Sequence, residues 1–279
     1  MTYPSPRVAI VTGANTGIGR ATALELVRRG FAVVLAGRSA ERLGSAADAI
    51  REATGSDHVE TLVVDLASFA SIRRAAATFL ASGRPLHLLI NNAGVAGGRG
   101  LTADGFELAF GVNHLGHFLL TDLLIERVVE SAPARIINVS SRGHYRARGV
   151  DFDAVTRPTR SLTGVPEYRT SKLANVLFTA ELARRHPPAS VSAYALDPGL
   201  VATDVWRRIP RPIRALVTRS MASPATGAHT TLHLATSPDV AGESGGYYVD
   251  GAPREPNPLA RDEALGQELW RRSAQWVRG

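Results

Sequence analysis

The chain has 279 residues, of which 44% are hydrophobic and 20% charged, a composition typical of a globular protein with one large domain. It contains no cysteine, which excludes disulfides, thiol nucleophiles and cysteine-based zinc sites. Its formal charge of +7 would suit a nucleic-acid partner. The arginines are dispersed among acidic residues, however, and no nucleic-acid-binding motif is present. We therefore interpret the arginines as solvated helix surface and expect no nucleic-acid partner.

The sequence also bears on location. No run of 18 or more apolar residues is present, and the first ten residues lack the charged start and apolar core of a signal peptide. We therefore expect a cytoplasmic protein with no membrane-spanning helix.

Short β-branched runs alternate with longer helical patterns along the whole chain. The strands are mostly apolar, which is typical of a parallel sheet covered on both faces. No repeat or composition shift marks a boundary, so we predict a single α/β domain over 1–279, a doubly wound (Rossmann) parallel sheet of about seven strands. The predicted strands are 8–12, 32–36, 60–64, 86–90, 135–139, 191–195 and 247–249, and the predicted helices are 19–29, 40–52, 71–80, 102–130, 167–186, 224–236 and 259–276.

A glycine-rich turn follows the first predicted strand directly and opens a helix. Strand, turn and helix N-terminus in this order indicate dinucleotide binding. Gly13 permits the tight turn, Gly17 lets the backbone approach a pyrophosphate, and Gly19 allows close packing of the helix. Free N–H groups and the helix dipole then favour an anion. The turn is Thr12-Gly13-Ala14-Asn15-Thr16-Gly17-Ile18-Gly19.

The end of the second predicted strand bears on the choice of cofactor. An enzyme that prefers NAD usually places a carboxylate here for the ribose 2′-hydroxyl, whereas an arginine accommodates a 2′-phosphate. No acidic residue occurs in 31–40, and Arg38 stands near the required position. We therefore predict NADP(H) in preference to NAD(H). The alternative is that Arg38 is a solvated loop residue.

The chain contains one lysine, Lys172, against 31 arginines, and Tyr168 lies four residues before it. On a helix this spacing puts both side chains on one face. An ammonium near a phenol favours the phenolate and lowers the phenol pKa. The pair is therefore a candidate general acid/base, and the alternative is that one lysine has survived by chance.

Further polar motifs stand at the ends of predicted strands or on the helices that follow, where open α/β sheets bind ligands. Taken singly, each could be an ordinary turn, strand end or helix residue. Taken together and in order with the two motifs above, they resemble the short-chain dehydrogenase/reductase family over residues 7 to about 250. The segments 12–19, 112–118 and 171–175 are most similar to its retinol-dehydrogenase-like branch. The motifs are Asp65-Leu66, Asn91-Asn92-Ala93-Gly94, Asn113 within Gly111-Val112-Asn113-His114, Ser140-Ser141 and Pro198-Gly199.

The resemblance implies a role for each matching residue. Tyr168 would be the general acid for carbonyl reduction or the base for alcohol oxidation, and Lys172 would lower its pKa and hold the nicotinamide ribose. Ser141 would hydrogen-bond the substrate oxygen, and Asn113 would hold a water that links Lys172 to solvent. Asp65 would meet the adenine, Asn92, Ala93 and Gly94 the ribose, and 198–203 the nicotinamide. The implied cofactor-binding residues are Gly13, Asn15, Thr16, Gly17, Ile18, Gly19, Arg38, Asp65, Leu66, Asn92, Ala93, Gly94, Tyr168, Lys172, Pro198, Gly199, Val201 and Thr203, and the implied catalytic residues are Asn113, Ser141, Tyr168 and Lys172.

Departures from the family pattern concern the substrate, which we expect to be a small carbonyl or alcohol compound. Between Ser141 and Tyr168 lie 26 residues, more than in compact members, and Asp197 stands where the retinoid-active branch commonly has histidine. Both features argue against assigning the retinoid specificity of that branch to this chain. We expect 142–167 and 200–222 to cover the substrate. The arginines of 207–214 fit a solvated lid, recognition of an anionic substrate, or peripheral contact with an acidic membrane surface.

Several other interpretations remain open. A catalytically silent dinucleotide-binding regulatory protein would keep the same fold, and epimerase or dehydratase chemistry is a lesser alternative. His229 and His233 have a metal-ligand spacing, but nothing nearby supplies further ligands, so we predict no metal site and treat them, with His114 and His117, as packing or surface residues. Homo-oligomers often form in the family through the helices that hold Asn113 and Tyr168, although the long insert could cover that face.

Overall fold

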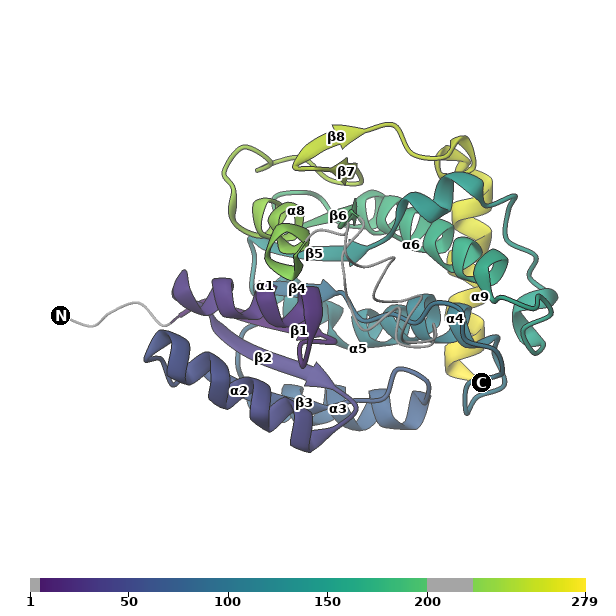
Figure 1. The fold of residues 1–279 in the computed structure, drawn as a ribbon. Helices are drawn as coiled ribbons and strands as arrows, with labels where there is room; N and C mark the ends of the chain where they lie inside the picture. The colour runs from purple at the N-terminus through teal and green to yellow at the C-terminus, as the bar shows by residue number, and fades with distance from the viewer. Residues whose placement is uncertain (1–5, 200–222) are drawn as a thin grey trace.

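One mixed sheet organises residues 6–199 and 223–279, which are the part of the chain described by this computed structural model (Figure 1). Eight strands are found in these ranges, in the spatial order β3-β2-β1-β4-β5-β6-β7-β8, and every neighbouring pair is parallel except β7 with β8. The predicted doubly wound parallel sheet is confirmed. The strands are β1 (Val8–Thr12), β2 (Ala32–Gly37), β3 (Val59–Val63), β4 (Leu88–Asn91), β5 (Ala134–Val139), β6 (Val191–Asp197), β7 (Tyr247–Val249) and β8 (Ala252–Arg254).

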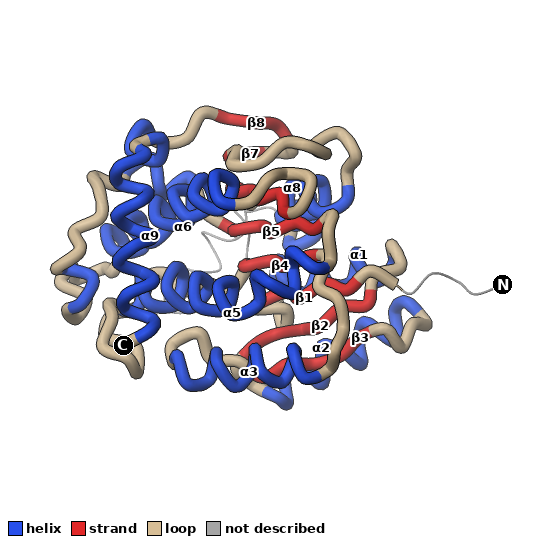
Figure 2. Tube along the Cα trace, turned by 180° about the vertical axis from the view of Figure 1, so that it is seen from behind, coloured by secondary structure: helices blue, strands red, loops and turns tan. Residues whose placement is uncertain are grey.

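Helices cover both faces of the sheet (Figures 1 and 2). On one face lie α1 (Gly17–Arg28), α2 (Ala40–Thr54) and α8 (Pro224–Thr236). The other face carries α3 (Phe69–Ala81), α5 (Gly116–Glu130) and α6 (Val165–Arg185), with α9 (Glu263–Arg278) packed outside α5 and α6. Short helical segments complete the connections: α4 (Leu108–Phe110), the π-helical turn η1 (Gly111–Leu115), and the 3₁₀ turns η2 (Arg142–Arg146), η3 (Ala154–Thr156) and η5 (Pro258–Arg261).

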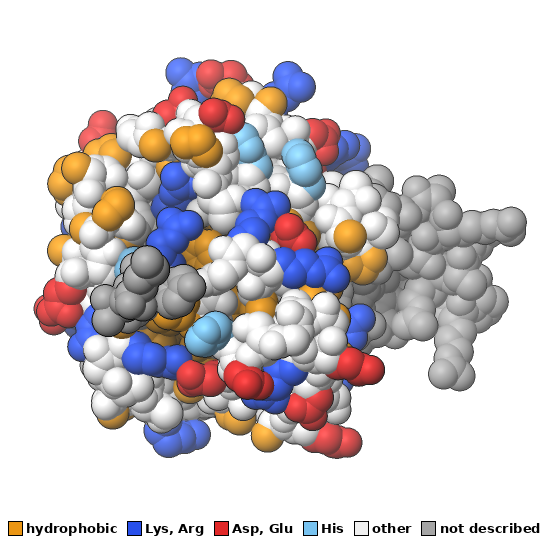
Figure 3. Space-filling model, turned by 90° about the vertical axis from the view of Figure 1, so that its left-hand side faces the viewer, with side chains coloured by type: hydrophobic (Ala, Val, Ile, Leu, Met, Phe, Trp, Pro, Cys, Tyr) orange, Lys and Arg blue, Asp and Glu red, His pale blue; other side chains and the backbone are white. Residues whose placement is uncertain are grey.

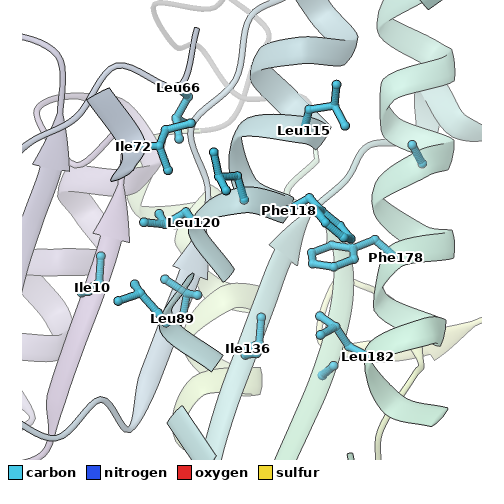
Figure 4. Packing of buried hydrophobic residues seen from close by; sticks show 14 of the residues in the cluster. Ile10, Leu66, Ile72, Leu89, Leu115, Phe118, Leu120, Ile136, Phe178 and Leu182 are labelled. Atoms are coloured by element: carbon cyan, nitrogen blue, oxygen red, sulfur yellow. The ribbon is translucent and has the colours of Figure 1, made fainter. Parts of the chain in front are cut away.

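Alternate strand residues fill two separate cores, one on each side of the sheet. Ile10, Leu89 and Ile136 point toward α5 and α6, where Phe118 and Phe178 pack with their ring centroids 5.3 Å apart (Figure 4). Burial of this apolar surface, at roughly 25 cal/mol per Å², is the main term that holds the helices on the sheet.

Most predicted elements end within a few residues of the observed ones, and two larger differences from the sequence prediction have a clear physical cause. The predicted seven strands omit β8, because Ala-Pro-Arg is exposed and carries no apolar alternation. The predicted helix 102–130 begins only at Leu108, because Thr102 to Gly105 form a turn in which Gly105 has a φ of 84°. The Glu107 side chain then accepts a hydrogen bond from the Phe110 N–H and caps the helix.

The stretch Leu108–Glu130 is long and apolar enough to cross a membrane by composition, with a mean hydropathy of 1.3. The criterion of an unbroken apolar run did not identify it, because polar residues interrupt the sequence. In the fold, 78% of its most apolar 18-residue segment is buried inside the protein, as in the core helix of a folded domain. Packing against the sheet accounts for its apolar character.

Basic and acidic side chains are mixed on the surface shown in Figure 3. Many arginines form ion pairs one helical turn from a carboxylate, as Arg29 does with Glu25 and Arg271 with Glu268. Exposed pairs of this kind each contribute roughly 0.2–0.5 kcal/mol. Charges of both signs are therefore interspersed on this face.

Candidate active site

The phosphate-binding turn lies where the strand order reverses, since β1 pairs with β2 on one side and β4 on the other. This switch point is where open α/β sheets bind dinucleotides. Gly13 has a φ of 68°, and a Cβ at Gly19 would lie 2.5 Å from the Gly13 carbonyl oxygen. The two glycines therefore leave a backbone-lined cradle at the N-terminus of α1, which fits the pyrophosphate of a dinucleotide.

The turn after β4 is hydrogen-bonded to the end of β1. The Thr12 hydroxyl accepts from the N–H groups of Asn92 and Ala93, each at 2.9 Å. The Asn92 side-chain amide donates to the Thr12 carbonyl at 2.7 Å. These contacts fix the predicted ribose-binding turn directly beside the phosphate-binding turn.

The four predicted catalytic residues converge at the carboxyl ends of β4, β5 and β6. Asn113 is fully buried in the π-helical turn, where its side chain bonds the backbone of Val95 and donates to the Ser171 hydroxyl at 2.9 Å. Ser171 in turn donates to the Tyr168 carbonyl at 2.7 Å. The Ser141 side chain lies near the Tyr168 phenol and, through hydrogen bonding, lowers the phenol pKa. The neighbouring Ser140 is turned away, since its hydroxyl donates to the Lys172 carbonyl.

Lys172 and Tyr168 lie side by side on α6, as the i, i+4 spacing predicts. The Lys172 Nζ is 5.6 Å from the centre of the Tyr168 ring and donates to the Val139 carbonyl oxygen at 2.8 Å. Lys172 is only 4% exposed. Burial therefore lowers the pKa of Lys172 to about 8, while the charge of Asp197 raises it.

The predicted lowering of the phenol pKa by the ammonium was wrong. Burial raises the pKa of Tyr168, the Ser141 hydrogen bond opposes this rise, and the charge of Asp197 adds to it. Desolvation disfavours the charged form of both groups, and for the phenol it outweighs the other influences. At neutral pH the phenol is protonated and able to donate.

An ion pair that the sequence did not predict closes one side of the site. The Asp197 carboxylate, 4% exposed, accepts from the Arg142 Nε at 2.6 Å and from the Arg142 N–H at 3.2 Å. The two residues are 55 positions apart, so no local pattern could reveal the pair. From the sequence alone, Asp197 was notable only because the retinoid-active branch commonly has histidine at this position.

The other predicted cofactor residues lie around the same edge of the sheet. Arg38 is exposed at the end of β2, and the Asp65 carboxylate accepts from the Ala67 N–H at 3.0 Å. The Leu66 side chain is buried in the core (Figure 4), so only its backbone could contact a cofactor. Asn15 and the N-cap residue Thr16 precede α1, and Gly17 and Ile18 begin it. Pro198 and Gly199 follow β6, whereas Val201 and Thr203 lie outside the described residues.

Only one of the two predicted substrate-covering segments lies in the part of the chain that the structure describes. The segment 200–222, with its arginines at 207–214, lies outside the described residues. The segment 142–167 packs against the body of the protein: Thr159 donates to the buried Glu107 carboxylate at 2.5 Å, and Val155 belongs to the core. Its role as a substrate cover stays a prediction.

The histidines noted in the sequence divide into two groups. His114 and His117 are buried packing residues, 1% and 2% exposed, whereas His229 and His233 line a pocket between α1 and α8 together with Arg29. Within 6–199 and 223–279, no three histidine or acidic side chains gather as a metal site.

Helix α9, rather than the long insert, covers the outer faces of α5 and α6. Trp270 packs on Phe118 and Phe178 with centroid distances of 5.1 and 5.7 Å, and the Arg185 guanidinium lies 4.2 Å from the Trp270 ring centre. The face through which family members often pair is thus occupied by this chain's own helix.

Comparisons with known proteins agree with this geometry. The sequence model of the short chain dehydrogenase family matches residues 7–150. Human retinol dehydrogenase 13 is 43% identical over 283 residues, covering 97% of this chain and 84% of that protein. The crystal structure of an uncharacterised protein from Mycobacterium paratuberculosis is 32% identical with a TM-score of 0.77, covering 98% of this chain and 93% of that one. A short chain dehydrogenase from Escherichia coli CFT073, crystallised with NADPH, shares the fold at 22% identity and a TM-score of 0.69, covering 88% and 97%.

Proposed function

Because the chain belongs to the short-chain dehydrogenase/reductase family, in its retinol-dehydrogenase-like branch, and is an NAD(P)-dependent oxidoreductase, we propose that it interconverts a carbonyl and an alcohol with NADP(H) as preferred cofactor. The observation that carries the proposal is the position of Tyr168, whose ring centre lies 5.6 Å from the Nζ of the buried Lys172. The family membership does not favour the alternative of a catalytically silent protein.

A nicotinamide cofactor, when bound, would supply or accept the hydride, while the protein's own residues handle the proton and the developing charge. In the reducing direction the Tyr168 phenol donates its proton to the substrate oxygen. The Ser141 hydroxyl donates a hydrogen bond to the same oxygen as negative charge develops on it. The raised pKa of Tyr168 keeps this proton available at neutral pH.

The proposed reaction is tested with Tyr168→Phe, which removes the donor and keeps the ring. We expect NADPH oxidation against a panel of aldehydes, ketones and quinones, followed at 340 nm, to fall by at least about a hundredfold, since a positioned acid contributes roughly 10²–10⁴-fold. NADPH should still bind. Turnover that survives in Tyr168→Phe would refute the assignment of Tyr168.

The preference for NADP(H) rests on Arg38, whose guanidinium suits the geometry of a 2′-phosphate, and on the absence of acidic residues in 31–40. The related fold crystallised with NADPH is consistent with this choice. Arg38→Ala should reduce the ratio of NADPH to NADH efficiency by about tenfold, the loss expected for one charge-assisted contact. Arg74→Ala, at an exposed arginine of α3, is the matched control. An unchanged ratio in Arg38→Ala would disprove the preference.

The substrate is proposed to be a neutral apolar or mid-sized carbonyl compound. The relatives are named for retinol, so retinal and retinol belong in the panel, and their poor turnover is the result expected from Asp197 and the long insert. The cytoplasmic location stays a prediction, which cell fractionation tests directly.

A further inference from the structure

Buried His117 lies between the end of β1 and the π-helical turn that holds Asn113. It occupies the first turn of α5 and is 2% exposed. Its Nδ1 is 3.0 Å from the Asn113 backbone carbonyl oxygen, and its Nε2 is 2.9 Å from the Thr12 hydroxyl. One imidazole therefore touches the end of β1 and the π-helical turn at once.

The hydrogen-bond geometry sets the direction of each bond. A carbonyl oxygen only accepts, so the His117 Nδ1 carries the proton that it donates to Asn113. The Thr12 hydroxyl already accepts from the N–H groups of Asn92 and Ala93, which occupies both of its lone pairs. It must therefore donate to the His117 Nε2, since that atom is closer than the Ile90 carbonyl oxygen at 3.3 Å.

These bonds form one continuous path. It begins at the turn 92–93, passes through the Thr12 hydroxyl and the His117 ring, and reaches the backbone of Asn113. The Asn113 side chain continues it through Ser171 to the Tyr168 carbonyl. The path joins the turns predicted to hold the cofactor to the helix that carries the predicted acid.

We propose that His117 is a positioning residue: a neutral histidine that ties the Thr12 end of β1 to the π-helical turn of Asn113 and holds the dinucleotide-binding turns in their binding geometry. The inference rests on one part of the proposed function, namely that a nicotinamide dinucleotide binds at the carboxyl ends of β1 and β4. Burial lowers the pKa of His117 to about 4, so the imidazole keeps this donor and acceptor arrangement throughout the neutral range.

The second buried histidine of the same region provides a matched control. His114 is 1% exposed, and its Nε2 contacts the Ser273 hydroxyl in α9 rather than the site. Burial also lowers the pKa of His114, to about 3. Replacing either histidine by phenylalanine removes a buried neutral imidazole, but only the change at His117 breaks the path.

The test measures dinucleotide affinity, by fluorescence titration and by the rise in melting temperature on addition of NADPH or NADH, whichever the wild type binds more tightly. We expect His117→Phe to weaken binding by about tenfold, because two buried groups lose their partner. His114→Phe should stay within about twofold of the wild type, as expected of a change that leaves the binding turns intact.

Two smaller changes separate the two ends of the ring. In His117→Gln the side-chain oxygen stands near the position of Nε2 and can accept from Thr12, whereas in His117→Asn the amide stands near Nδ1 and can donate to Asn113. Gln should restore most of the dinucleotide affinity and Asn should not, a difference that remains measurable even if His117→Phe does not fold. Equal affinities of the Gln and Asn variants, or equal losses in His117→Phe and His114→Phe, would overturn the proposal. A wild type that binds the dinucleotide but reduces no carbonyl would refute the proposed reaction and leave this test intact.

Discussion

The close approach at Gly19 leads to the sharpest prediction about the phosphate-binding turn. In Gly19→Ala the new Cβ would lie 2.5 Å from the Gly13 carbonyl oxygen and 2.6 Å from the Asn92 Nδ2. Both neighbours are held in place, the first as backbone and the second through its 2.7 Å bond to the Thr12 carbonyl. The helix must therefore move away from the turn.

The size of the effect follows from these contacts. Forcing a methyl group into a packed backbone contact costs about 1–3 kcal/mol, and loss of the Asn92 bond adds about 1 kcal/mol. We expect the free energy of unfolding to fall by about 2–4 kcal/mol. Because about 1.4 kcal/mol corresponds to a tenfold change in binding, dinucleotide affinity should fall by at least about tenfold as the cradle opens.

Gly44→Ala is the control, because a Cβ at that position of α2 meets nothing within 4 Å. Alanine is the better helix former, so this variant should gain about 0.5–1 kcal/mol. Urea unfolding and NADPH titration of the two variants measure both quantities. A Gly19→Ala protein as stable as the wild type, with unchanged NADPH affinity, would refute the argument from close approach.

Three further predictions concern other parts of the fold. The pKa values of His114 and His117, lowered to about 3 and about 4, mean that the unfolded chain binds protons first as the pH falls below 6.5. As the pH falls from about 6 to 4, these two histidines should together lower the free energy of unfolding by about 2.7 kcal/mol per pH unit. His114→Phe should remove about half of this contribution from the slope measured by urea unfolding, and an unchanged slope contradicts the assignment. Asp197→Asn should move the pH–rate profile to lower pH, because the Asp197 charge raises the pKa values of Lys172 and Tyr168; an unmoved profile would exclude this influence. Trp270→Ala should cost about 3 kcal/mol, and a melting temperature lowered by less than about 2 °C would show that α9 is held by other contacts.

Local patterns were sufficient for the parallel strands β1 to β7 and for the polar side chains at the edge of the sheet. The apolar strands and the glycine turn between β1 and α1 depend on residue spacing along the chain, so both could be read without knowing what packs against them. The i, i+4 placement of Tyr168 and Lys172 likewise follows from helix geometry alone. In a parallel sheet the carboxyl ends of the strands share one edge, which is why motifs scattered from Thr12 to Lys172 meet there.

Other features depend on contacts between residues far apart in the sequence. The start of the helix at Leu108 rather than at 102 involves the cap of Glu107, whose carboxylate is also bound by Thr159. Strand β8 is defined only by its antiparallel pairing with β7, which no local pattern in its three residues predicts.

The electrostatics of the site belong to this second group. The Tyr168 phenol pKa rises because burial outweighs the neighbouring charges, and burial is a property of the whole fold. His117 is indistinguishable from any helical histidine until β1 brings Thr12 to its Nε2. A sequence specifies which groups a protein possesses, whereas desolvation and hydrogen-bond partners arise only when packing brings distant segments together.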